Sequence, residues 1–531
     1  MVEAHAATWA YRLTRFAMRY RPLVMVAGVA VVALLAASVV IAFLAYQANE
    51  ARQRAELRRG QAEGLVHFMV VELRKELDKV GRLDVLDSVH GAALEYFAKV
   101  PVTTLSNDEL ARQSQTLYQI GEVRVRRGDV AGAVEPFEES LALAQSLADR
   151  DPNNGQRLYD LGQSYFWLGY VHWRQSDLES ALPPFEAYRD IAQQLVEIDP
   201  DNLEWVKELS HANSNLGSML QDLGDLEGAL EHFERTLEID RRLSVAAPDD
   251  LIQRSDVVHA HDALGMVHRR LGRLDSAAGH LRANLDLAAS LVADEASNPG
   301  WNELLGNAHE QFARLCRDRG ALADAERSFS EANRIFADLV EHDPENAVWQ
   351  LRRTWGLLGL AQVALDRGEV DQTLEATATA RQILDLGVER DPSDLLWRRA
   401  LATAHYLEGA ALAIRGEDAA RDPLAQAIEL LESVLEESPG HRLAQRWLAM
   451  VQLARGRFLE MKSDPSGAQQ AWQRAEALLA PLSEQGEDGR VLAPRAEALL
   501  RLGRAQDAGP LLDRLDRQGF RVPELIALRG Q

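Results

Sequence analysis

Cysteine is almost absent from this sequence of 531 residues, which contains Cys316 alone. A single cysteine excludes an internal disulfide bond and any metal site built from several thiolates. Cys316 occupies a helix position that other repeats of the chain, described below, fill with arginine, histidine or leucine. We therefore interpret it as a packed thiol and not as a reactive one.

Positive charge is also scarce. The formal net charge is −23 at pH 7, and residues 1–60 carry eight arginines against three acidic residues, which leaves −28 for the remainder. A nucleic-acid-binding surface needs an excess of basic residues, so nucleic acid is excluded as a partner of that remainder as a whole. Two interpretations of the acidic surface stay open: it keeps the protein soluble, or it selects basic segments of a protein partner.

Glycine and proline recur at a fixed step instead of being scattered. A glycine, or once a serine, follows the predicted first helix of each repeat, and these residues lie 48 positions apart across seven repeats. Prolines in the loops keep the same spacing with small displacements. A regular period of this length is typical of a solenoid, in which each repeat packs on its neighbours. The residues that mark the turns are Gly128, Ser176, Gly224, Gly272, Gly320, Gly368 and Gly416.

Other equivalent positions in successive repeats, which we call columns, also recur every 48 residues. A small residue in the first helix is followed by alanine 12 positions later and by a large apolar residue 16 positions later, as at Gly217, Ala229 and Phe233. This pattern resembles the tetratricopeptide repeat, in which two antiparallel helices meet at small residues. The resemblance implies an all-α fold, a right-handed superhelix of helical hairpins of the tetratricopeptide (TPR) type.

The repeat is 14 residues longer than the 34-residue family unit. Because 14 residues make about four helical turns, we expect each helix to gain about two turns and to reach about 20 residues. Residues 203–222 and 226–246 are predicted examples.

The repeat pattern weakens along the chain. The sixth repeat places Thr373 and Thr377 where alanine and a large apolar residue are expected, the seventh places Arg421 and Ala425 there, and the eighth is one residue early. We predict five segments: a short cytoplasmic segment (1–22), a transmembrane helix (23–46), a helical linker with a capping helix pair (47–103), eight repeats (104–480) and a short degenerate terminal repeat (481–531).

One apolar run begins at Leu23 and ends at Tyr46, with no charged residue between them. A helix of 24 residues is long enough to span a bilayer of about 30 Å with some tilt, so we predict an uncleaved membrane anchor. A cleavable signal peptide is the main alternative, but its apolar region is usually shorter. Arginines flank both ends in equal number; those at positions 19 and 21 lie nearer the run and favour a cytoplasmic N-terminus with the repeats outside the cytoplasm.

The segment from Thr8 to Arg21, TWAYRLTRFAMRYR, precedes this run, and a Glu/Arg-rich stretch from Gln47 to Glu63 follows it. Together they resemble the juxtamembrane and anchor region of bacterial receptor-type serine/threonine kinases. The resemblance implies the same topology, with a repeat domain beyond the anchor. The glycine-rich loop, His-Arg-Asp and Asp-Phe-Gly motifs of kinases are missing from the sequence, so no kinase activity is carried over.

The stretch from Ala62 to Val100 has two apolar faces of helical period, separated by a turn at Gly81. We expect a helix pair that covers the exposed end of the first repeat. Ser106 and Glu109 then form a capping-box pattern at the start of that repeat.

Histidines also recur at the repeat step, at His211 and His259, at His261 and His309, and at His405. Equivalent positions on neighbouring helices lie about 10 Å apart, whereas zinc ligation requires bonds of about 2 Å. We interpret these columns as inherited repeat positions and predict no metal, no cofactor and no catalytic residue.

The inner, concave face of such a solenoid is lined by its first helices. Side chains three before, one after and about four after each small residue are predicted to face inward, where they would bind a protein or peptide. The second repeat stands out, because its three aromatic residues share one face and could accept apolar side chains of a partner; burial of these rings against the neighbouring repeat is the alternative. The predicted groove residues are Tyr118, Glu122, Phe166, Tyr170, Trp173, Gln221, Asp262, Met266, Arg269 and Arg314. Four further tryptophans near the starts of first helices, Trp205, Trp301, Trp349 and Trp397, are predicted to pack between repeats.

Two functional hypotheses follow from the sequence. The first is a membrane-anchored, non-enzymatic interaction scaffold that binds a protein or peptide, possibly a basic one, in the groove. The second is the sensor or regulatory half, or a kinase-less remnant, of a receptor-type kinase. The sequence identifies neither the partner nor the oligomeric state.

Overall fold

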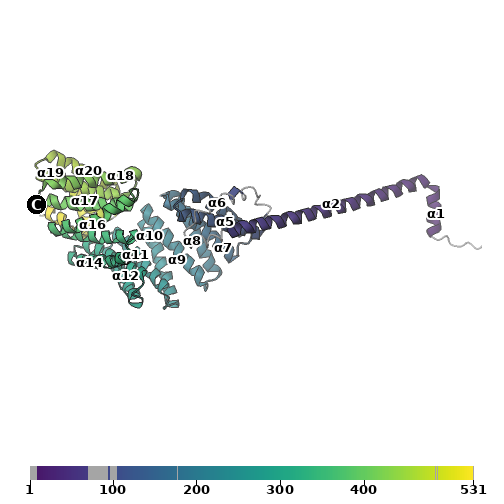
Figure 1. The fold of residues 1–531 in the computed structure, drawn as a ribbon, viewed down its shortest axis with the longest axis horizontal. Coiled ribbons are helices and arrows are strands. Elements are labelled where there is room, and N and C mark those ends of the chain that lie inside the picture. The colour runs from purple at the N-terminus through teal and green to yellow at the C-terminus, as the bar shows by residue number, and fades with distance from the viewer. Residues whose placement is uncertain are drawn as a thin grey trace, which may run out of the picture. The chain divides into compact units, whose positions relative to one another are not determined.

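The structure is a computed structural model that describes residues 9–69, 94–95, 105–175, 177–484, 486 and 488–529. Within these residues the secondary structure is helical, with no β-strand. Within each unit, neighbouring helices pack on one another, as α5 does on α6 and α9 on α10 (Figure 1). The predicted all-α solenoid of helical hairpins is therefore confirmed.

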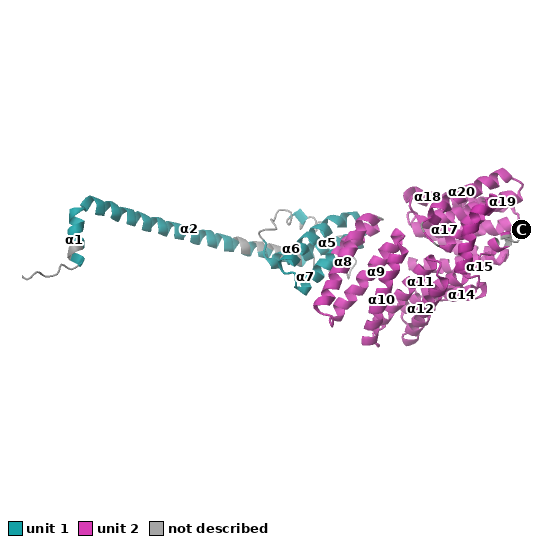
Figure 2. Ribbon diagram, turned by 180° about the vertical axis from the view of Figure 1, so that it is seen from behind, with its two compact units in different colours: residues 1–164 teal, residues 165–531 magenta. Residues whose placement is uncertain are grey.

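The chain divides into two compact units, residues 1–164 and residues 165–531 (Figure 2). The boundary falls within helix α7 (Gly155–Arg174), the first helix of repeat 2. The other elements described in unit 1 are α1 (Trp9–Arg19), α2 (Arg21–His67), α5 (Asn107–Arg126), η4 (Ala131–Ala133) and α6 (Val134–Arg150).

Unit 2 continues the helical pairs. Each repeat contributes a first and a second helix, and α9 and α10, for example, have 21 residues each, as the length of the repeat predicts. The elements after α7 are α8 (Leu178–Ile198), α9 (Leu203–Leu223), α10 (Leu226–Ala246), α11 (Leu251–Arg270), α12 (Leu274–Asp294), α13 (Pro299–Asp318), α14 (Leu322–His342), α15 (Ala347–Asp366), α16 (Val370–Arg390), α17 (Leu395–Ile414), η5 (Asp418–Ala420), α18 (Arg421–Glu437), α19 (Arg442–Met461), α20 (Pro465–Glu484), α21 (Gly489–Arg501), α22 (Ala505–Gln518) and α23 (Pro523–Arg529).

Helix α2 contains the apolar run and continues beyond its predicted end at Tyr46 as far as His67. Its stretch Arg21–Arg54 is long and apolar enough to cross a membrane; the most apolar 18 residues within it have a mean hydropathy of 2.8, and none of these is buried. Of the predicted helix pair between residues 62 and 100, residues 62–67 belong to α2, and most of the remainder lies outside the described residues.

Repeated caps fix where the helices begin and end. Ser106 and Glu109 form the predicted capping box at the start of α5. In later repeats an Asn or Asp side chain accepts a hydrogen bond from a backbone N–H of the first turn, which satisfies a donor that the helix itself cannot. These N-caps keep the 48-residue step: Asn202, Asp250, Asn298, Asn346 and Asp394. The turn glycines have positive φ angles, 94° at Gly224 for example, a region that residues with a Cβ rarely adopt.

The helices of a repeat meet at the predicted small residues. A Cβ added at Gly121 would lie 2.6 Å from the Phe137 ring, and one added at Gly217 would lie 2.9 Å from the Phe233 ring. Both rings are buried. The small residue in the first helix therefore makes room for the large apolar side chain of the second.

The prediction that the seventh repeat lacks the alanine and the large apolar residue, with Arg421 and Ala425 in their places, is wrong. Ala420 and Leu424, each one position before the expected place, are buried, and the Leu424 side chain lies 2.7 Å from a Cβ added at Gly409. Gly416 is still in register, so the one-residue deletion assigned to the eighth repeat lies in the loop before α18, where η5 forms. The predicted register is therefore wrong by one residue between this loop and the start of the eighth repeat, where the predicted displacement already applies.

The C-terminal helices of unit 2 pack on repeats far from them in sequence (Figure 1, yellow). Leu492, Leu515 and Phe520 belong to the same buried cluster as Leu281 of α12 and Leu315 of α13. The backbone N–H of Arg521 also donates a hydrogen bond to the Asp318 carbonyl oxygen, at 2.9 Å. The terminal helices therefore return to the fourth and fifth repeats instead of covering only the eighth.

Candidate functional site

The two groove residues predicted in unit 1 contact their own repeat. The half-buried Tyr118 ring lies 6.2 Å from the Phe137 ring, centroid to centroid, in an edge-on arrangement. Glu122 is buried and forms an ion pair of 2.7 Å with Arg126 one turn later. Both residues thus have partners within their own helical hairpin.

The aromatic residues of the second repeat form one half-buried cluster in unit 2. Phe166 lies 6.3 Å from the buried Phe185 ring and 6.0 Å from the Tyr170 ring. Trp173 packs edge-on against Phe185, and its Nε1–H donates a 2.8 Å hydrogen bond to Asp222 of α9. The rings therefore pack on α8 and α9 and leave part of their surface exposed, an arrangement between the two alternatives that the sequence left open.

The predicted residues of repeats 3 and 4 include two buried polar atoms without a hydrogen-bond partner among the described residues. These are Oε1 of Gln221 and Oδ1 of Asp262. Burial, followed by the nearby Glu310 carboxylate, raises the pKa of Asp262 to about 7. Met266, in the same helix, is half-buried.

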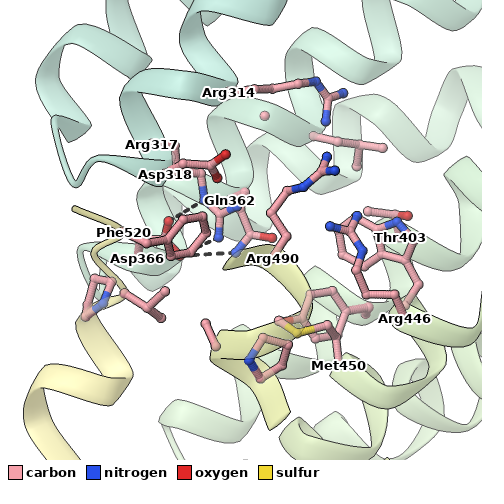
Figure 3. Close-up of a pocket in the computed structure, with 18 of the residues that line it drawn as sticks. Arg314, Arg317, Asp318, Gln362, Asp366, Thr403, Arg446, Met450, Arg490 and Phe520 are labelled. Atoms are coloured by element: carbon pink, nitrogen blue, oxygen red, sulfur yellow. Dashed lines mark hydrogen bonds and ion pairs between the residues drawn. The ribbon is translucent and has the colours of Figure 1, made fainter. Parts of the chain in front are cut away.

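Arg269 and Arg314 are the predicted groove residues that line a cavity, which we call the arginine cavity. It has a volume of about 130 Å³ and lies wholly in unit 2 (Figure 3). Its lining residues are Arg269, Arg314, Arg317, Asp318, Phe329, Trp355, Leu358, Gly359, Gln362, Asp366, Thr403, Tyr406, Arg446, Trp447, Met450, Arg457, Arg490, Ala493, Pro494, Glu497, Phe520, Arg521, Val522 and Pro523.

The predicted inward-facing columns continue into this cavity. The column of Asp262 and Glu310 reaches Leu358 and Tyr406 in the next two repeats at the same 48-residue step. The column of Arg314 reaches Gln362 and, after the one-residue deletion, Arg457; the column of Arg269 reaches Arg317. Extending the columns past the fifth repeat would have found these residues.

Other lining residues come from outside the columns. Arg490 lies at the start of α21, residues 520–522 lie between α22 and α23, and Pro523 is the first residue of α23. The Arg490 side chain extends towards the wall that carries Arg314, and Arg446 lies across the cavity (Figure 3). No repeat pattern locates these residues, because a distant contact of the terminal helices brings them to the site.

Arginine dominates the charge of the cavity lining, with seven arginines against three carboxylates. Three ion pairs join lining residues. Arg269 and Asp318 are both buried at an Nε–Oδ2 distance of 2.9 Å, Arg317 pairs with Asp366 at 2.5 Å, and Arg457 pairs with Glu497 at 3.1 Å. Arg314, Arg490 and Arg446 belong to none of these three pairs.

Arg314 and Arg490 each bind a carboxylate through two of their three guanidinium nitrogens. Arg314 donates from Nε and Nη2 to Glu310, at 3.0 and 2.6 Å. Arg490 donates from Nε and Nη2 to the two oxygens of Asp488, at 2.9 and 2.7 Å. The described hydrogen bonds leave the Nη1 group of each arginine available to another acceptor.

Arg446 belongs to none of the described ion pairs, although the carboxylates of Asp488 and Asp318 lie near enough to raise its pKa. Its Nε is buried without a hydrogen bond, and its guanidinium lies 5.3 Å from the centre of the Trp447 ring. Burial, followed by the nearby Arg490, outweighs the carboxylates and lowers the pKa of Arg446 to about 9. An anion that enters the cavity would therefore stabilise this buried cation.

Aromatic rings form the apolar part of the wall. The Trp355 ring has Arg314 at 5.9 Å and Arg399 at 5.3 Å from its centre, so cations are stacked on it. Burial lowers the pKa of Arg399 to about 10, and Arg314 adds to this effect. The cavity thus combines guanidinium donors with rings that exclude water.

The histidine and cysteine positions do not extend the site. His261 and His280 lie 3.0 Å apart between their Nδ1 atoms, and no group of three potential ligands that could hold a metal occurs among the described residues. Cys316 is buried, and burial raises the pKa of its thiol to about 11. Trp349 and Trp397 are buried as predicted, whereas Trp205 and Trp301 are half-buried.

Comparison with known proteins supports the fold. Residues 214–246 match the family model of the tetratricopeptide repeat. No curated protein sequence matches the chain. The crystal structure of the apo form of RapI covers 79% of this chain and 98% of its own, at 10% sequence identity and a TM-score of 0.52. At that identity the likeness shows a shared fold alone, so the chain is a solenoid of the tetratricopeptide type.

Two other solved structures match with lower scores. The apo form of the quorum sensor NprR from B. thuringiensis covers 79% of this chain and 99% of its own, at 13% identity and a TM-score of 0.46. A Rap protein complexed with competence and sporulation factor covers 80% and 99%, at 14% identity and a TM-score of 0.44. Neither score is high enough to support an argument about function.

Proposed function

We propose that the chain is a membrane-anchored, non-enzymatic scaffold that binds a segment of a partner protein, or a peptide, on the inner face of unit 2. One observation carries the proposal: inward-facing columns of successive repeats meet in the arginine cavity. Concave sites that combine apolar walls with a few polar groups are the usual form of binding sites. The cavity is therefore the part of the groove where we expect a partner side chain to enter.

No reaction is included in the proposal. The lining residues contain no histidine, cysteine or lysine that would act as a base or an activated nucleophile. Their charges are arranged as ion pairs and as cations stacked on rings, which suits binding.

The membrane part of the proposal depends on α2. Its exposed apolar stretch would be costly in water and suits the hydrocarbon core of a bilayer. We place its N-terminal end in the cytoplasm and the repeats outside the cytoplasm, at the inner membrane of a bacterium. A reporter that is active only outside the cytoplasm, fused after Gln531, tests this topology; an inactive reporter in a well-expressed fusion would place the repeats in the cytoplasm.

Two surfaces of unit 2 favour partner groups of opposite charge. The overall acidity favours a basic segment, and a groove of about 520 Å³ that contains Glu429, Glu432 and Glu436 would suit one. The arginine cavity favours an anionic group. We propose that one partner segment presents both, an anionic group to the cavity and basic residues to the acidic surface. The alternative, a regulatory half of a receptor-type kinase, rests on the resemblance of residues 8–63 alone.

Peptide selection tests the binding function. A random peptide library is selected on the full chain in detergent micelles, and the selected peptides are measured against Met450→Trp, which fills the cavity, and Met461→Trp, an exposed position at the end of the same helix. We expect Met450→Trp to abolish binding and Met461→Trp to preserve it. Equal binding to both variants would exclude the cavity.

The predicted aromatic groove is tested in the same selection. The double substitution Phe166→Ala and Trp173→Ala removes the two rings that pack on Phe185. Loss of binding in this variant, with Met450→Trp unaffected, would move the site to the second repeat.

A further inference from the structure

The arginine cavity brings three guanidinium groups together from separate elements, namely Arg314 of α13, Arg446 of α19 and Arg490 of α21. Figure 3 shows their side chains around one space. Two of the three hold carboxylates with Nε and Nη2 and keep Nη1 for another acceptor. The Nε of Arg446 is buried without a hydrogen bond, and none of the described hydrogen bonds includes its guanidinium group. The cavity therefore presents N–H donors from three directions, and the described contacts give these donors no acceptor.

The number and direction of these donors distinguish between possible anions. A carboxylate offers two oxygens in a plane, whereas a phosphoryl group offers three oxygens in a tetrahedral arrangement and a charge of about −1.5 to −2 at pH 7. Guanidinium groups bind phosphate oxygens in pairs, with short charge-assisted hydrogen bonds. Three guanidinium groups on different walls match the three-oxygen group better than the planar one.

The size and walls of the cavity fit the same ligand. A volume of about 130 Å³ accommodates a phosphoryl group on a short side chain but not a folded segment. The rings of Trp355, Trp447 and Tyr406 contribute to the apolar part of the lining, and an apolar lining strengthens charge-assisted hydrogen bonds within the cavity.

We propose that the arginine cavity binds a phosphoryl group carried by a side chain of the partner protein segment, with Arg446 as its principal ligand. This inference rests on the proposed function, because it supposes that a protein segment occupies the groove. Arg314 and Arg490 complete the site through their Nη1 groups while Glu310 and Asp488 hold them in place. The carboxylates act as positioning residues and do not touch the ligand.

Two peptide libraries test the inference on the full chain in detergent micelles. Both have random flanking residues, and the central residue is phosphoserine in one and serine in the other. We expect the phosphoserine library to bind at least about tenfold more tightly, because its phosphoryl oxygens would accept charge-assisted hydrogen bonds that serine cannot form. Inorganic phosphate and phenyl phosphate, measured by isothermal titration calorimetry, serve as small probes.

Three variants assign the effect to Arg446. Arg446→Met keeps the volume and removes the donors, Arg446→Lys keeps the charge and removes the planar group, and Arg235→Met removes an exposed arginine of α10 that lines neither the arginine cavity nor the acidic groove. We expect Arg446→Met to remove the preference for phosphoserine, Arg446→Lys to reduce it, and Arg235→Met to leave it unchanged. Far-ultraviolet circular dichroism confirms that each variant is folded.

The outcomes separate this inference from the proposed function. Equal binding of both libraries to the unmodified chain, abolished by Met450→Trp, would overturn the phosphoryl site and support the binding function. Arg446-dependent binding of phenyl phosphate or inorganic phosphate, with neither library bound, would support a phosphoryl site. It would overturn the proposal that a partner protein carries the phosphoryl group. Failure of every probe would overturn the inference.

Discussion

The second repeat and the arginine cavity use the same inward-facing positions of the solenoid with opposite chemistry. Phe166, Tyr170 and Trp173 fill them with rings that pack on neighbouring helices. Three and four repeats later, Arg314 and Gln362 stand in the column of Tyr170 and line a cavity. A repeat therefore sets where a side chain points, whereas the groups opposite it decide whether that side chain becomes core or site.

The groups opposite these two regions differ in origin. The rings of the second repeat meet Phe185 of their own hairpin and Leu216 of the next, both supplied by the local repeat. The arginines meet Arg490 and residues 520–523, which the terminal helices bring from outside the neighbouring repeats. The comparison predicts that the aromatic region contributes strongly to stability and that the cavity contributes little.

The largest expected effect is on the aromatic region. Phe185→Ala removes a ring with no exposed surface that contacts Phe166, Trp173 and the helix around Gly169. We expect the free energy of unfolding to fall by about 3–5 kcal/mol, because the surrounding helices cannot fill the space. Urea unfolding followed by circular dichroism measures it. Leu223→Ala, at an exposed position of α9, is the control; equal losses in both would contradict the assignment of a core.

Acid should destabilise the helices around the cavity. His405 in α17 is 5% exposed, and burial together with Arg381 lowers its pKa to about 4, while Glu408 lies at 4.0 Å. A folded-state pKa below the unfolded value of about 6.5 means that the unfolded chain binds the proton first, so stability is full above pH 6.5 and falls as the pH decreases to about 4. The loss amounts to at most about 3 kcal/mol.

Urea midpoints at pH 7 and pH 5 measure this effect on the full chain. We expect His405→Gln to reduce the difference between the two midpoints. His342→Gln, at an exposed position at the end of α14, should leave it unchanged. An unchanged difference in His405→Gln would show that other groups cause the acid response.

The hydrogen bond between Trp173 and Asp222 should have a smaller effect. Trp173→Phe keeps an aromatic ring against Phe185 and removes the Nε1 donor. We expect a loss of about 1 kcal/mol, because water can reach the exposed Asp222 in its place. A double-mutant cycle with Asp222→Ala isolates the interaction, and a coupling energy near zero would show that the bond adds nothing.

The smallest expected effect is at the cavity. Arg446→Met removes a buried cation that belongs to none of the described ion pairs and has both cations and carboxylates near it, Arg490 and Asp488 first among them. We expect the free energy of unfolding to change by less than about 1 kcal/mol in either direction, since the desolvation of a buried charge offsets most of its attraction to nearby carboxylates. A loss as large as that of Phe185→Ala would mean that Arg446 is structural, and the contrast between the two regions would disappear.

Local signals in the sequence predicted the fold and part of the site. The constant repeat step located the turns at Gly224 and Gly320, the contacts of Gly121 and Gly217 with aromatic rings, and the columns that contain Arg269 and Arg314. These features depend on residues close together in one repeat. The slip before α18 was missed, because one deleted residue in a loop left Gly416 in place and moved Leu424.

The complete cavity could not be predicted from the columns. Arg490 and Phe520 reach it through the packing of Leu492 and Leu515 against α12 and α13. Such a contact depends on two surfaces that lie several repeats apart in the sequence, and no periodic pattern encodes it. Whether Arg446 forms an ion pair also depends on how the helices pack, which the sequence of one repeat does not determine.

The return of the terminal helices to the fourth and fifth repeats has a consequence for synthesis. A ribosome that adds about 5–20 residues per second needs about 10–40 s to progress from Gly320, at the end of α13, to Arg521, which binds the Asp318 carbonyl. During that interval Leu274 of α12 and Leu315 of α13 lack part of the surface that later buries them. Nascent chains of this length should therefore bind chaperones until the last helices emerge.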